Sequence, residues 1–133
     1  MPIFAELLTV AKKIDNYAAD ATGGGLWTST TTYEVTVPAG KRWFLLGGVI
    51  KPDTSATTST TAYNAADEPL YKIGYQAAGT NLQAMLKQTA DYNHANPHGH
   101  PLVLDAGDYV DVEFGAAQGA SAYCSCVVLE VDV

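Results

Sequence analysis

Apolar and polar residues alternate with a period of two through most of the chain after residue 26. In residues 30–37, Tyr33, Val35 and Val37 alternate with polar residues, a pattern typical of a strand with one buried face. The same or a more continuous apolar pattern recurs in the ranges 42–50, 70–76, 102–104, 109–114 and 122–133. The range 42–50 is nearly all apolar and is followed by Pro52, which favours a strand covered on both faces or bent at Gly47-Gly48.

Turn signals separate these segments and favour two layers of sheet. Val37-Pro38-Ala39-Gly40 and Leu104-Asp105-Ala106-Gly107 each precede a further strand, and we expect each to form a tight hairpin corner. Residues 53–62, rich in Thr and Ser, predict an exposed loop leading into a polar edge strand, and residues 82–86 favour a strand over a helical turn. With about 7–8 strands, the chain predicts an all-β antiparallel β-sandwich or jelly roll.

The first twenty residues have a different period. Their apolar positions recur at helical spacing, which predicts a short amphipathic helix. Gly23, Gly24 and Gly25 then end the helix and supply a flexible joint. We therefore expect a helical arm over residues 1–22, a glycine-rich joint over 23–26 and a β-sandwich domain over 27–133. The stripe that we expect to bind a partner consists of Phe4, Leu7, Leu8, Ala11 and Ile14.

Composition and charge narrow the range of partners. The chain has 133 residues, 47% hydrophobic and 16% charged, with a formal net charge of −7. Such an acidic chain repels phosphate backbones, so nucleic acid is not an expected partner. No run approaches the roughly 18–20 apolar residues of a membrane span, and the N-terminus lacks the pattern of a secretory signal. We therefore expect no membrane partner and assembly in a cytoplasm.

Residue types with reactive side chains form no recognisable catalytic motif. The cysteines, Cys124 and Cys126, lie two residues apart on one predicted strand, a spacing that favours free thiols on one face. Asp111 and Glu113 alternate with valines, which places them on a solvated face and not in an acid–base pair. Neither a nucleophile motif nor a phosphate-binding glycine loop is present. We expect no enzymatic activity and no cofactor.

Two groups of residues remain as candidate binding sites. His94, His98 and His100 fall within seven residues, and three imidazoles could hold zinc or nickel, although the prolines and glycine around them indicate an irregular loop. Trp27, beside the glycine joint, could stack on a sugar ring. A carbohydrate-binding module is therefore an alternative to an assembly protein.

The segments Val37–Gly48 and Leu102–Val110 carry a resemblance to a known class of proteins. Over residues 30–133 the chain resembles small β-sandwich virion proteins of tailed bacteriophages. The resemblance implies a capsid decoration (cement) protein that stabilises the capsid surface, with a phage tail or receptor-binding component as the alternative. It implies a place in the virion, the major capsid protein or other virion subunits as partners, and a homo-oligomer, with a trimer favoured. It carries no catalytic residues.

Overall fold

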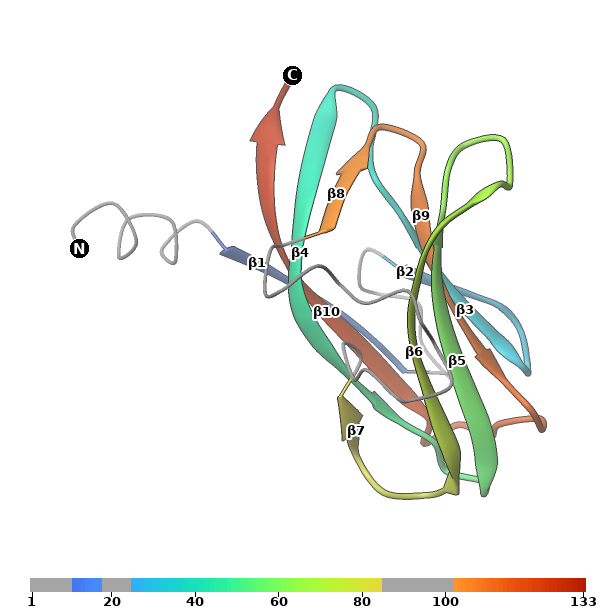
Figure 1. Cartoon of the computed structure of the whole chain (residues 1–133). Helices are drawn as coiled ribbons and strands as arrows, with labels where there is room; N and C mark the ends of the chain where they lie inside the picture. The colour runs from blue at the N-terminus through green and yellow to red at the C-terminus, as the bar shows by residue number, and fades with distance from the viewer. Residues whose placement is uncertain (1–10, 18–24, 85–101) are drawn as a thin grey trace.

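The computed structural model of the chain describes residues 11–17, 25–84 and 102–133, and within them all regular secondary structure is β (Figure 1). These strands form two antiparallel sheets, each of five strands in the described ranges. The β4 sheet consists of β1 (Ala11–Tyr17), β10 (Tyr123–Asp132), β4 (Lys41–Lys51), β7 (Gln83–Ala84) and β8 (Leu102–Asp105), in that order except that β7 and β8 both pair with β4. The β9 sheet has the order β2 (Gly25–Ser29), β3 (Thr32–Thr36), β9 (Tyr109–Phe114), β5 (Ala56–Tyr63) and β6 (Pro69–Gly79).

The hydrophobic core lies where the inward faces of the two sheets meet. Trp43 and Leu45 of β4, Val110 and Val112 of β9, and Tyr33 of β3 are at most 2% exposed. The predicted alternation is confirmed in β3, β8 and β9, where every second side chain is buried. The two-layer all-β architecture expected from the sequence is therefore confirmed.

The two predicted corners are turns, but they are not hairpins. Residues 38–40 lead from β3 in one sheet to β4 in the other, and residues 106–108 lead from β8 to β9 in the same way. Gly40 and Gly107 both have positive φ, 72° and 88°, a conformation that glycine adopts without strain. The corners also bond to each other, because Val37 N donates to Asp108 O and Gly107 N donates to Val37 O. Their similarity in sequence therefore reflects a shared crossing between sheets.

Two loops at the other end of the sandwich are joined by one buried side chain. Gln118 is 7% exposed. Its Oε1 accepts from the backbone N of Asp53 at 3.0 Å and of Thr54 at 3.2 Å, and its Nε2 donates to the carbonyls of Thr54 and Ala116. The Asp53 carboxylate accepts from Gly119 N at 2.8 Å. Side-chain polar atoms thus satisfy backbone groups that loops cannot pair by themselves.

The predicted N-terminal helix is wrong for residues 11–17, which form strand β1 at the edge of the β4 sheet. Seven residues of β1 face seven of β10, so pairing with β10 satisfies the backbone that a helix would have satisfied internally. The segment also alternates, since Ile14 faces the core while Lys13 and Asp15 lie on the other face. Tertiary pairing overrides a weak helical periodicity here. The remaining residues of the predicted arm, 1–10 and 18–22, lie outside the described residues.

Over residues 53–62, the expected loop is found at 53–55 and leads into strand β5, but the expectation of an edge strand is wrong. β5 lies between β9 and β6 and is not an edge strand. Thr58 and Thr60 are 1% and 2% exposed and face inward with Ala56 and Ala62. The Thr58 hydroxyl donates to Gln83 Oε1 at 2.7 Å, so a buried polar group keeps a partner. Gln83 belongs to the short strand β7, in agreement with the strand expected at residues 82–86.

Candidate functional site

The outer face of the β9 sheet is polar and acidic. Antiparallel register places Leu26, Glu34, Asp111, Thr61 and Lys72 side by side across the five strands; we call these residues the acidic row. Glu113, two residues after Asp111, lies on the same face. The five strands of this sheet together carry three carboxylates and one cation, so this side of the molecule holds uncompensated negative charge.

Asp111 is the most perturbed carboxyl group of this face. Burial, followed by the charges of Glu113 and Glu34, raises the pKa of Asp111 to about 6. Its Oδ1 atom is buried and has no hydrogen-bond partner among the described residues. Desolvation and like charges both disfavour the ionised form. The group therefore takes up a proton in mildly acidic solution, but it lies on an open sheet face and not in a cleft.

The outer face of the β4 sheet has the opposite character. Ala11, Leu129, Phe44 and Val103 are side by side across β1, β10, β4 and β8; we call them the apolar row. Val103 is 41% exposed, and the other three are partly exposed. Further apolar residues of β4 and β10 extend the same face along the strands, namely Leu46, Val49, Val127 and Val131. Leu46, at the bulge of β4, is 42% exposed.

Ion pairs balance the charges on the strands of the β4 sheet. The strands of the β4 sheet carry five cations and four carboxylates. Each of the four carboxylates has a cationic partner on the same sheet, in the pairs Lys12–Glu130, Lys13–Asp15, Lys41–Asp132 and Arg42–Asp105. The hydrogen bond from Lys41 lowers the pKa of Asp132, so that carboxyl is ionised at neutral pH. This sheet is therefore close to neutral although the chain is strongly acidic.

The residues predicted to bind a partner do not form one surface in the described structure. Ala11 belongs to the apolar row, whereas Ile14 is 2% exposed and lies in the core, because residues three apart on a strand point to opposite faces. Phe4, Leu7 and Leu8 lie outside the described residues, as do all three predicted metal ligands, His94, His98 and His100. Within the described ranges, no group of three or more His, Cys, Asp and Glu side chains is placed to hold a metal ion.

Trp27, the predicted sugar contact, has its ring packed within the sandwich. The indole stacks on Phe114 with ring centroids 5.5 Å apart and an interplanar angle of 14°, and it also contacts Tyr33. Tyr63 and Tyr109, on the outer face of the β9 sheet, stack on each other at 5.2 Å and 19°. Rings that stack on protein neighbours leave less of their faces for a sugar. These aromatic residues do not form a flat stacking platform.

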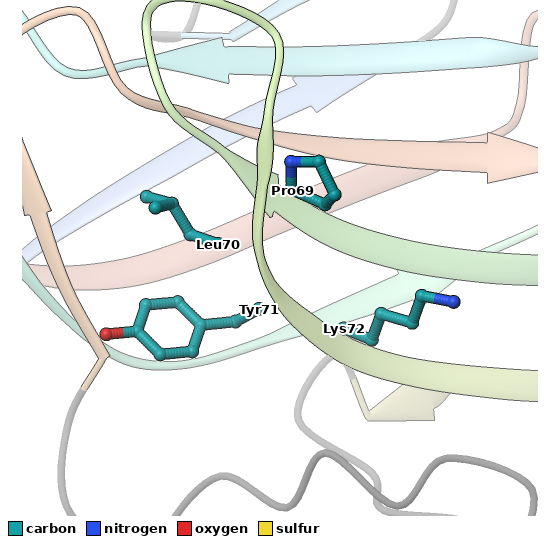
Figure 2. Close-up of a pocket in the computed structure, with 4 residues that line it drawn as sticks. All are labelled: Pro69, Leu70, Tyr71 and Lys72. Atoms are coloured by element: carbon teal, nitrogen blue, oxygen red, sulfur yellow. The ribbon is translucent and has the colours of Figure 1, made fainter.

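A small open hollow lies at the start of β6. Figure 2 shows the four residues that line it, Pro69, Leu70, Tyr71 and Lys72, with Tyr71 and Lys72 on opposite sides of the strand. Its volume is about 220 Å³, less than the ~300 Å³ at which ligand pockets begin. All four lining residues are exposed. The hollow has the form of a surface dimple and not of a substrate pocket.

The two cysteines lie in the core and belong to neither outer face. Cys124 and Cys126 are free and fully buried on the inward face of β10, as their spacing predicted, and burial raises the pKa of the Cys126 thiol to about 12. No helix in the described part of the chain is long and apolar enough to span a membrane.

The apolar row is the feature that the choice of candidate residues missed. Its signal is present in the sequence, because the ranges 42–50 and 127–131 are apolar at nearly every position, which predicts strands covered on both faces. The stripe predicted to bind a partner lies instead near the N-terminus, where the spacing of the apolar residues predicts a helix. Comparison of the chain with protein-family models, with curated proteins and with solved structures finds no match.

Proposed function

We propose that the protein is a non-enzymatic structural protein of a phage virion, and that it is a capsid decoration (cement) protein which binds and stabilises the capsid surface. In this proposal it works as a homo-oligomer in contact with the major capsid protein or other virion subunits, and it assembles in the host cytoplasm. Its resemblance to small β-sandwich virion proteins, carried by Val37–Gly48 and Leu102–Val110, supports the virion setting.

The apolar row is the single observation that carries the proposal of assembly. In an antiparallel sandwich the outer sheet faces normally contact water and are polar, as in the β9 sheet. The β4 sheet instead presents Leu129, Phe44 and Val103 side by side on its outer face. Exposed apolar patches with a polar rim mark surfaces that bind other proteins. The described part of the chain is thus better suited to assembly than to catalysis.

We also propose that the sandwich is a jelly roll. Crossings between sheets dominate the described connections, because the chain passes from one sheet to the other between β3 and β4, β4 and β5, β6 and β7, β8 and β9, and β9 and β10. Such crossings are typical of double-sheet jelly rolls, whereas simple meanders remain in one sheet.

Co-sedimentation with capsids tests the proposed function. The purified chain is mixed with expanded heads from the phage or prophage that encodes it, and the bound fraction is measured after pelleting. We expect saturable binding with a fixed number of copies per capsid, and heads that withstand higher temperature when the chain is bound. Binding that is absent, or that rises without saturation, would overturn the decoration role. Pelleting with unrelated capsids serves as the control.

A further inference from the structure

We propose that the outer face of the β4 sheet is the contact between two copies of this chain, packed face to face about a two-fold axis. The inference rests on the proposed function only in taking the apolar row as an assembly surface, and it goes further by naming the occupant as a second copy. Two sheets packed in this way would interdigitate the side chains of their facing surfaces, as the two sheets within one chain do.

Charge favours a second copy on this face over any other face of the sandwich. Two chains of formal charge −7 repel each other, so a self-contact must lie where the local charge is balanced. On the strands of the β4 sheet every carboxylate has a cationic partner. The acidic row lies on the opposite sheet, with Glu34 and Asp111 adjacent to each other. Face-to-face contact through the β4 sheet therefore keeps the acidic faces of both copies in solvent.

Surface composition points the same way. Interface cores are depleted of charge and rich in aromatic and aliphatic side chains, while their rims are polar. Phe44 and Leu129 lie on the two middle strands of the face, β4 and β10, and Tyr17 stacks on Tyr123 at one end with ring centroids 4.8 Å apart. The ion pair between Arg42 and Asp105, at 2.6 Å, lies at the other end. An apolar centre between polar ends is thus already present in one copy.

The size of the face is enough for a small specific interface. The strands β1, β10, β4 and β8 have 7, 10, 11 and 4 residues, and at ~4.8 Å by ~3.4 Å per residue they give roughly 500 Å² per copy. Two copies would then bury roughly 1,000 Å² together, which is about the smallest area expected of a specific protein interface. Within the described residues, the β9 sheet packs on the inner side of this sheet only.

Analytical ultracentrifugation of the full chain tests the proposal. We expect the wild-type chain to sediment as a dimer or as a multiple of dimers at micromolar concentration. Val103→Lys and Leu129→Lys, each made separately, should raise the dissociation constant at least ~30-fold, because each places a charge in the apolar row within the contact. Thr61→Lys is the matched control, since it places the same charge on the acidic row of the other sheet and should leave association unchanged.

Circular dichroism and thermal unfolding of each variant show whether it has folded. Val103 is 41% exposed, so Val103→Lys should keep the wild-type spectrum even if Leu129→Lys does not. A wild-type chain that is monomeric at 100 µM and above would overturn the inference, and so would self-association that both folded variants retain. Capsid binding by a monomeric chain would refute the dimer while leaving the decoration role intact. Self-association without capsid binding would refute the decoration role while leaving the dimer intact.

Discussion

Replacement of Asp111 by Asn should stabilise the fold at neutral pH and leave it nearly unchanged near pH 4. Burial and the charges of Glu113 and Glu34 raise the pKa of Asp111 from the ordinary 3.8 to about 6 in the folded protein. Between these two values the folded state binds more protons than the unfolded state. Its stability therefore falls as the pH rises through this range and stays constant above about pH 6.

The size of the effect follows from the shift in pKa. A shift of about two units corresponds to about 3 kcal/mol at ~1.36 kcal/mol per unit. Asp111 is partly exposed at the sheet surface, so screening by solvent reduces the penalty, and we expect a net gain of ~1 kcal/mol for Asp111→Asn at pH 7.5. Asn keeps the shape of the side chain and carries no charge.

Urea unfolding of the wild type and of Asp111→Asn at intervals between pH 4 and pH 8 measures the difference directly. The contributions of other titrating groups to the free energy of unfolding cancel in that difference. The difference should grow between about pH 4 and pH 6 and then level off. Glu113→Gln is a second test, because removing that charge lowers the pKa of Asp111 and should move the rise to lower pH. A difference that does not depend on pH would refute the reasoning.

Three further perturbations probe the interior. Gln118→Ala should cost about 2–3 kcal/mol in urea unfolding, because it leaves loop amides and carbonyls unpaired; a loss below ~0.5 kcal/mol would contradict the role of Gln118 as a clamp. Tyr33→Phe should raise the free energy of unfolding by ~1 kcal/mol, because the Tyr33 hydroxyl is buried and has no hydrogen-bond partner in the part of the chain that the structure describes; a fall in stability would show that the hydroxyl has a partner. Cys124 and Cys126 should not react with Ellman's reagent in the folded chain and should react fully in 8 M urea, since burial raises the pKa of both thiols; rapid reaction of the native protein would contradict their burial.

The strands were predictable where the chain alternates or is flanked by turn residues. The alternation of Tyr33, Val35 and Val37 predicted β3, and the turn residues before Gly40 and Gly107 predicted the two corners. The period of β1 was misread because Ala11 and Ile14, three residues apart, fit one helical stripe, whereas in the strand both faces carry an apolar side chain. Short apolar runs are ambiguous in this way until a partner strand is known. The inward position of Thr58 was missed because threonine reads as polar, although its methyl group packs well in a sheet.

The candidate site was less predictable than the fold. The apolar run 42–50 favoured a strand covered on both faces or bent at Gly47-Gly48, and residues 122–133 predicted a long final strand. Neither pattern showed that their outer side chains would form one row with Ala11 and Val103. The predicted histidine site lies outside the described residues and stays a prediction. The position of Trp27 beside three glycines suggested an exposed ring. Only the positions of Phe114 and Tyr33 in the fold show that the ring is packed against them.

By itself, the sequence determined the period of most strands and the places where the chain turns, because these depend on neighbouring residues, and the excess of negative charge, because that depends on composition alone. Only the tertiary structure decided which strands pair, and through that pairing the character of the two outer faces. Arg42 meets Asp105 across 63 positions of sequence, and Glu34 meets Asp111 only because β3 pairs with β9. Such contacts depend on packing between distant segments, which local patterns do not encode.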